Sequence, residues 1–154
     1  MTERHDACRE YLDSYRELLM ESERLSSGAR SLWEAATGVT SHLTGMPVSH
    51  DAERDVKTLL AEASEAAERH LAEALRKRAE IETFIGTIPG GMNRMILSYR
   101  YINLMTWPQV MAAMENAGIP YSERNIFNLH GRALEAAREK WNELHRKGED
   151  HACL

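Results

Sequence analysis

The sequence lacks the features that mark membrane and secreted proteins. It contains no run of about 18 apolar residues, so no transmembrane helix is expected. The opening residues MTERHDACREYL are charged and have no apolar centre, which argues against a secretory signal. Only two cysteines occur, Cys8 and Cys153, and they lie near opposite ends of the chain, so a disulfide framework is not expected. These absences predict a cytoplasmic protein with no membrane contact.

Motifs of catalysis are also missing. The chain has no phosphate-binding glycine loop, no HExxH pair and no nucleophile–base arrangement at a known spacing. His5 with Cys8, and His151 with Cys153, would make a zinc site only if the two ends of the chain met, and their spacing is not that of a usual ligand set. We therefore expect no enzymatic activity, no metal and no cofactor.

Basic charge is scarce, but it is unevenly distributed. The formal net charge is −5. Residues 1–91 hold 11 Lys/Arg against 17 Asp/Glu, whereas residues 92–154 hold 8 against 7. The acidity therefore belongs to the first part, and the second part is free to meet a polyanion locally, although without a strong nonspecific attraction.

Proline is rare, at four residues, and no alternating strand pattern of useful length appears, so the chain is expected to be all-α. A first helix begins near Arg4 and either ends at LSSG, residues 25–28, or continues through ARSLWEAAT. A turn-rich stretch follows, and a second helix spans about residues 52–85 with apolar residues three and four apart. Together these predict a long, coiled-coil-like antiparallel hairpin over residues 1–85, serving oligomerisation or partner binding.

A second unit is predicted over residues 86–148, after the boundary GTIPGG. Its first helix covers about residues 92–102. Thr106 and Gln109 then form a capping-box pattern around a helix start that tolerates Pro108. Ser122 caps the last helix, which is expected to run to about residue 147, with a flexible tail at 149–154.

The last helix has two distinct faces on a helical wheel. Ile126, Leu129, Ala133, Ala137 and Trp141 share one side, with His130 turned inward among them. The opposite side carries the set Arg124, Asn128, Gly131, Arg132 and Glu135, with Asn125 at its margin. Arg and Asn are side chains that read base edges in the major groove, and glycine allows a DNA backbone to approach. A merely solvated face is the alternative interpretation.

The stretches MILSYRYINLMTWPQV and YSERNIFNLHGRAL resemble region four of sigma-70-family transcription factors, and more closely the small sigma-like regulators of phages and prophages. The resemblance covers about residues 79–140, and YLDSYREL near the N-terminus is similar to the family's opening helix. One departure is the linker ENAGIPY, which is longer than the family's tight turn.

This resemblance implies a helix-turn-helix protein that binds double-stranded DNA and regulates transcription of phage or prophage late genes in a bacterial host cell. Carried over by position, Arg124, Asn125 and Asn128 are expected to face bases. Five further residues are expected to face phosphates: Arg100, Thr106, Ser122, Gly131 and Arg132. An intradomain ion pair is the alternative role for Arg100. RNA polymerase and a second copy of the chain are the other candidate partners.

Two other functions compete with transcription control. A small terminase-like packaging protein also combines a helix-turn-helix with oligomerising helices. A helical adaptor would bind RNA polymerase or another protein through the acidic hairpin without touching DNA.

Overall fold

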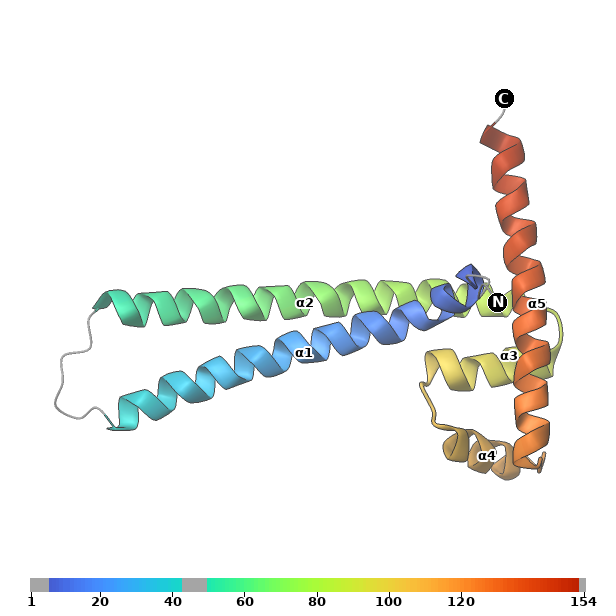
Figure 1. Cartoon of the computed structure of the whole chain (residues 1–154), viewed down its shortest axis with the longest axis horizontal. Helices are drawn as coiled ribbons and strands as arrows, with labels where there is room; N and C mark the ends of the chain where they lie inside the picture. Colours follow the sequence, from blue (N-terminus) through green and yellow to red (C-terminus); the bar gives the residue numbers. More distant parts are fainter. Residues whose placement is uncertain (1–5, 43–49, 153–154) are drawn as a thin grey trace, which may run out of the picture. The chain divides into compact units, whose positions relative to one another are not determined.

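The chain is helical throughout the parts that the structure describes. The computed structural model describes residues 6–42 and 50–152, and neither range contains a strand. The elements are α1 (Ala7–His42), α2 (His50–Gly86), α3 (Gly91–Leu97), the π-helical turn η1 (Ser98–Ile102), α4 (Trp107–Asn116) and α5 (Glu123–Ala152) (Figure 1). The all-α prediction is confirmed. None of these helices is long and apolar enough to cross a membrane.

The chain divides into two compact units. We call residues 17–76 the arm unit, and residues 1–16 with 77–154 the core unit. Both α1 and α2 pass from one unit to the other, because their outer ends belong to the arm unit and their inner ends to the core unit. These units describe packing within the chain, and the functional division predicted at residues 85/86 stays a prediction.

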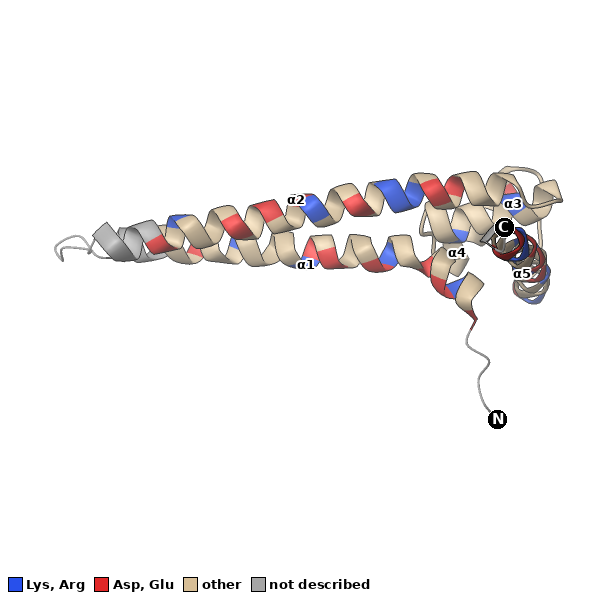
Figure 2. Ribbon diagram, turned by 90° about the horizontal axis from the view of Figure 1, so that it is seen from above, with Lys and Arg blue, Asp and Glu red and all other residues tan. Residues whose placement is uncertain are grey.

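The arm unit consists of one length of α1 and one length of α2, which run side by side in both views (Figures 1 and 2). Helix α1 continues through residues 25–28, so the predicted alternative of an end at LSSG is wrong. The turn-rich stretch predicted between the helices is shorter than expected, since α1 reaches His42 and α2 begins at His50. Residues 43–49 lie outside the described residues.

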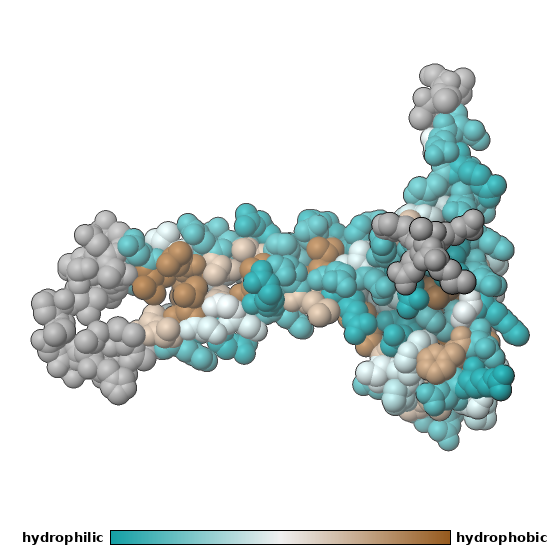
Figure 3. All heavy atoms as spheres, in the orientation of Figure 1, coloured by the Kyte–Doolittle hydropathy of each residue, from teal (hydrophilic) through white to brown (hydrophobic). Residues whose placement is uncertain are grey.

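The arm unit buries little apolar surface among its described side chains. Ser22, Ala29 and Ala74 are buried, and all three are small. Several large apolar side chains of the arm unit are instead exposed, namely Met20, Leu32, Trp33, Leu59, Leu71 and Leu75. Figure 3 shows apolar surface along this unit. Because large exposed apolar groups are unusual in such number on a small unit, this surface favours contact with another molecule.

The core unit has a well-formed apolar interior. Eight large side chains are almost fully buried, namely Leu12, Ile81, Ile88, Ile96, Leu97, Val110, Met114 and Ile126. They come from α1, α2, α3, α4, α5 and the turn after α2. Helix α3 packs against α5. Burial of this kind contributes roughly 1.5–3 kcal/mol for each large side chain, and α5 contributes Ile126 to this interior.

The start of α1 is tied to α5 by an ion pair. Asp6 accepts from the backbone N–H of Arg9 at 3.2 Å, so its side chain caps α1. The same carboxylate accepts from Arg138 at 2.6 and 2.9 Å. The hydrogen bond from Arg138 holds the pKa of Asp6 below its usual value. Next to this pair, the rings of Tyr11 and Trp141 pack with centroids 4.8 Å apart.

A π-helical turn replaces the end of the helix predicted over residues 92–102. Helix α3 ends at Leu97, and η1 carries the chain from Ser98 to Ile102. The wider turn is closed by a bond from the N–H of Asn103 to the carbonyl of Ser98, at 2.9 Å and five residues back. The wider turn changes the directions of the side chains within it, which include those of Arg100 and Tyr101.

Helix α4 has the predicted start and a well-defined end. The backbone N–H of Gln109 donates to the Thr106 hydroxyl at 3.4 Å, and the backbone N–H of Thr106 donates to the Gln109 side chain at 2.8 Å, so the capping box is confirmed. At the other end Gly118 has a φ of +78°, which favours glycine. The N–H of Ile119 reaches the carbonyl of Met114 at 2.9 Å, which closes a Schellman-type stop.

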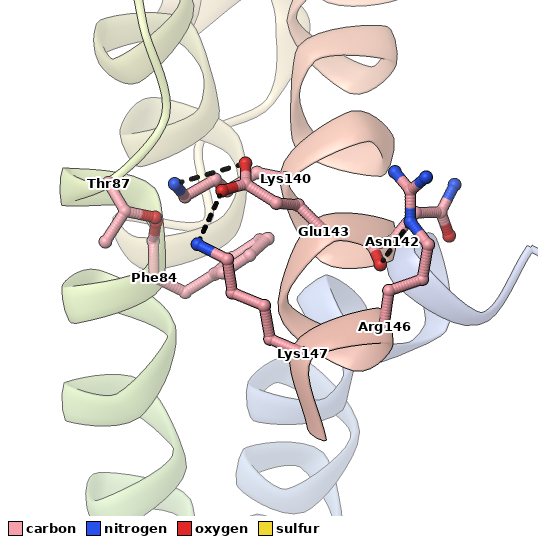
Figure 4. Close-up of polar contacts among 7 residues, drawn as sticks. All are labelled: Phe84, Thr87, Lys140, Asn142, Glu143, Arg146 and Lys147. Atoms are coloured by element: carbon pink, nitrogen blue, oxygen red, sulfur yellow. Dashed lines mark hydrogen bonds and ion pairs between the residues drawn. The ribbon is translucent and has the colours of Figure 1, made fainter. Parts of the chain in front are cut away.

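Helix α5 is longer than predicted. It extends to Ala152, so the expected end near residue 147 is wrong, and residues 149–152 are helical. Gly148 lies inside the helix and does not stop it. The ion pairs from Glu143 to Lys140 (3.5 Å) and to Lys147 (3.2 Å) support this last part (Figure 4).

Candidate nucleic-acid interface

Helix α5 presents its two predicted faces as expected. Ile126, Ala133 and Ala137 are at most 1% exposed. On the opposite side, Arg124, Asn128, Gly131 and Arg132 are all exposed, and so are Glu135 and Asn125. We call the residues Arg124, Asn128, Gly131 and Arg132 the polar stripe. The stripe is therefore displayed by a helix whose other face is fixed in the core.

Neither arginine of the polar stripe, Arg124 or Arg132, bonds to another described side chain through its guanidinium group. Among the described residues, no ion pair or side-chain hydrogen bond involves Arg124 or Arg132. Further along α5 the basic groups are engaged, since Arg138 pairs with Asp6, and Lys140 and Lys147 pair with Glu143. The first three turns of α5 thus hold the arginines without a partner in the described part of the chain. An anionic ligand could form charge-assisted hydrogen bonds with them.

Gly131 is not required by the fold. A Cβ atom built at this position would have no heavy atom within 4 Å, apart from its own helix neighbours. Its φ is not positive, so another residue would suffer no backbone strain there. Glycine in a helix interior is destabilising by about 1 kcal/mol relative to alanine. The glycine therefore costs stability without a reason inside the molecule.

The starts of α4 and α5 are both capped by hydroxyl groups, those of Thr106 and Ser122. Ser122 accepts from the backbone N–H of Asn125 at 3.4 Å, and its carbonyl accepts from the N–H of Ile126 at 3.0 Å. The predicted cap is thereby confirmed. Thr106 and Ser122 are both exposed, so their hydroxyl groups are accessible to a ligand. Two capped helix N-termini in one small unit provide N–H groups that favour anions.

Arg100 is positioned differently from the other predicted phosphate-facing residues. It is half-buried, its guanidinium carbon lies 4.2 Å from the centroid of the Trp107 ring, and Nη1 donates to the carbonyl of Met105 at 2.6 Å. Desolvation lowers its pKa from the ordinary value. These contacts brace the linker before α4, where Leu104 adopts an unfavourable φ of +52°. The predicted intradomain ion pair is replaced by a carbonyl bond and a cation–π contact, and a phosphate contact stays a prediction.

An aromatic junction joins η1, α4 and α5. The Tyr101 hydroxyl lies 3.0 Å from Nε2 of His130, and the Trp107 ring lies edge-on to His130 with centroids 4.9 Å apart. His130 is only 9% exposed, which agrees with its predicted inward orientation. Burial lowers the pKa of His130 to about 4, with the nearby charge of Arg100 acting in the same direction. A neutral imidazole is thus part of the packing, and it does not serve as a base reader.

Sequence reasoning missed Phe127. Its side chain is 44% exposed, and its ring lies edge-on to Trp107 with centroids 4.8 Å apart. It follows Arg124 by three residues and precedes Gly131 by four, so helical spacing alone assigns it to the edge of the polar stripe. Phenylalanine is apolar, and apolar residues of this helix were expected on the buried face.

The described residues contain no group of three or more His, Cys, Asp or Glu side chains able to hold a metal ion. Of the weak zinc candidates, His5 and Cys153 lie outside the described residues, and the side chain of His151 is likewise not described. Cys8 is buried, and burial raises the pKa of its thiol to about 11. Cys8 is therefore a packing residue rather than a reactive thiolate.

Comparison with known proteins adds one finding. Residues 47–130, just over half of the 154-residue chain, match the model of a family described as a protein of unknown function (DUF1492). No curated protein and no solved structure matches the chain. The matched region includes α3, η1, α4 and the start of α5, so it contains Thr106, Ser122, Arg124 and Asn128.

Proposed function

Because the chain belongs to the DUF1492 family, whose description names no activity, we propose its function from its own surface: sequence-specific DNA binding in the control of transcription. The proposed setting is the regulation of phage or prophage late genes in a bacterial cytoplasm, which rests on the sequence resemblance to sigma region four. In this proposal α4, the turn after it and α5 act as a helix-turn-helix, with α5 as the recognition helix.

The observation that carries the proposal is the exposed polar stripe on a helix whose opposite face is buried. Arg124 and Asn128 are exposed and one turn apart, and Gly131 leaves open space beside them. Amide and guanidinium groups so placed match the donor and acceptor pattern of the major groove. The absence of a side chain at Gly131 lets a sugar–phosphate backbone approach the helix closely.

Each residue has a distinct role in the proposed complex. Arg124, Asn125 and Asn128 contact base edges and determine sequence preference. Arg132, Gly131 and the capped N-termini at Thr106 and Ser122 contact phosphates and position the helix. Arg100 mainly positions the linker before α4, through its contacts with Met105 and Trp107. Any phosphate contact would use the guanidinium N–H groups that do not bond to Met105.

The test begins with selection of bound fragments from a phage-bearing bacterial genome, followed by affinity measurements on the retained site. Asn128→Ala is expected to weaken specific binding about tenfold, because one base contact of this type contributes roughly 1–3 kcal/mol. Arg132→Ala is expected to weaken all sequences alike and to reduce the salt dependence by about one phosphate. Arg146→Ala is the matched control, since Arg146 is exposed on the same helix but outside the polar stripe.

Sequence preference and assembly state distinguish the candidate functions. Retention of fragments without sequence preference, unchanged by Asn128→Ala, would rule out α5 as a recognition helix. Ring-shaped assemblies in solution would favour the terminase-like packaging function, whereas monomers or dimers would favour transcription control.

A second candidate function is that of an adaptor that binds protein through the arm unit. The exposed apolar side chains support it, and Trp33 at 57% and Leu59 at 52% are among the most exposed. Acidic and basic residues are interspersed along the arm unit (Figure 2), so a partner would meet apolar anchors surrounded by charged side chains. RNA polymerase is the partner that the sequence resemblance implies.

The adaptor function predicts a measurable effect of the arm residues alone. Trp33→Gln combined with Leu59→Gln is expected to weaken binding of the chain to purified bacterial RNA polymerase at least tenfold, because Trp is a frequent hot-spot residue and the apolar area of both side chains would be buried in the contact. Leu144→Gln, which changes an equally apolar exposed residue of α5, is the control. If the double variant binds as the unmodified chain does, the arm unit is not the contact surface.

A further inference from the structure

Phe127 is an exposed aromatic residue with a fixed orientation. Its side chain is 44% exposed, yet its ring packs in a T-shaped arrangement with Trp107, with ring centroids 4.8 Å apart and an interplanar angle of 68°. Trp107 is itself held by Arg100 on its face and by His130 at its edge. These successive contacts therefore restrict the rotation of the Phe127 side chain and fix the direction in which its exposed part points.

The core does not account for this exposure. Other side chains form the interior of the core unit, among them Val110 and Met114 of α4 and Ile126 of α5, which are at most 1% exposed. A phenyl ring that is nearly half exposed adds little to this packing and leaves apolar surface in water. Its position next to Asn128 in sequence and one turn after Arg124 indicates a role outside the core.

We propose that Phe127 contacts the C5 methyl group of a thymine in the major groove, beside the base that Asn128 reads. Thymine is the base whose major-groove edge carries a methyl group, and phenylalanine is one of the side chains that contact it. The contact replaces two exposed apolar surfaces by one buried surface. Because Trp107 already restricts the ring, little conformational entropy is lost on binding.

This inference rests on the proposed DNA-binding function and deepens it by naming one feature of the site. It specifies that the recognised sequence contains a thymine whose methyl group, rather than its hydrogen-bonding edge, is read. Insertion of the ring between base pairs does not fit, because the Phe127 ring packs against the Trp107 ring of α4.

The test replaces each thymine of the selected DNA site by uracil, one at a time, which removes the methyl group and nothing else. One such replacement is expected to weaken binding by the unmodified protein about fourfold, the value of one buried methyl group. Phe127→Ala is expected to weaken binding to the thymine site by a similar factor and to bind the thymine and uracil sites equally.

The controls separate the methyl contact from general loss of structure. Leu144→Ala alters a residue of the same helix with the same exposed fraction, 44%, and is expected to retain the thymine preference. Thermal unfolding of Phe127→Ala shows whether the variant is folded, and tolerance of uracil at every thymine by the unmodified protein overturns the methyl contact without any variant.

The outcomes also distinguish this inference from the function on which it rests. Absence of sequence-specific DNA binding overturns both. Specific binding that tolerates uracil at every thymine, or a thymine preference that survives in Phe127→Ala, overturns the methyl contact and leaves the DNA-binding function in place.

Discussion

Gly131→Glu is expected to reduce DNA affinity by at least ~50-fold while leaving the fold intact or more stable. A Cβ at this position meets no heavy atom within 4 Å, and the residue is exposed, so the longer side chain can be accommodated in the free protein. Helix propensity favours glutamate over glycine by roughly 0.5–1 kcal/mol. In the proposed complex, however, the new carboxylate would lie against a phosphate, and such like-charge contacts cost several kcal/mol.

The chain contains a matched control for this experiment. Gly148 is also an exposed glycine within α5, and a Cβ there likewise has open space. Gly148→Glu should give a similar gain in the free energy of unfolding and should leave DNA affinity within about twofold, since it lies nearly five turns from Gly131. Equal losses of affinity in the two variants would mean that added negative charge acts at long range and that Gly131 is not at the interface.

The second large effect is a loss of stability in acid caused by His130. The pKa of His130 is about 4 in the folded protein because of burial, whereas an exposed histidine of the unfolded chain has its ordinary pKa of 6.5. The folded state therefore binds fewer protons than the unfolded state between these values. Stability is fully present above pH 6.5 and falls as the pH drops toward 4. The expected loss from this one group is about 3 kcal/mol.

Chemical denaturation at pH 7 and pH 4 would measure this loss, with His130→Gln as the comparison. The glutamine variant retains a polar group near Tyr101 but has no titrating ring, so its stability difference between the two pH values should be smaller by about 3 kcal/mol. The contribution of Asp6, whose pKa is lowered by Arg138, is common to both proteins and cancels. A direct NMR titration of His130 with a midpoint near 6.5 would contradict the prediction even if the variant does not fold.

Local signals in the sequence predicted much of the core unit. The capping box at Thr106 and Gln109 requires only neighbours in the chain, and it is present. The buried face of α5 follows from the spacing of Ile126, Ala133 and Ala137, which tertiary packing then uses. Such predictions succeed because the determining interactions span only a few residues.

Features that depend on distant contacts were not predictable in the same way. The π-helical turn at Ser98–Ile102 has no distinct residue pattern, and the contact of Arg100 with Trp107 depends on how that turn aims the side chain. Glycine is a poor guide to helix ends as well, since Gly28 and Gly148 both lie inside helices. The exposure of Phe127 and its ring contact with Trp107 depend on tertiary packing, which residue spacing along the sequence does not reveal.

The placement of the three tryptophans makes the protein its own spectroscopic reporter. Trp33 is an exposed ring in the arm unit, Trp107 lies in the aromatic junction, and Trp141 packs on Tyr11 at the other end of the buried face of α5. Each indole therefore senses a different surface. In proteins that retain only one of them, fluorescence changes on adding DNA or a protein partner would identify which part of the molecule is engaged, without any attached label.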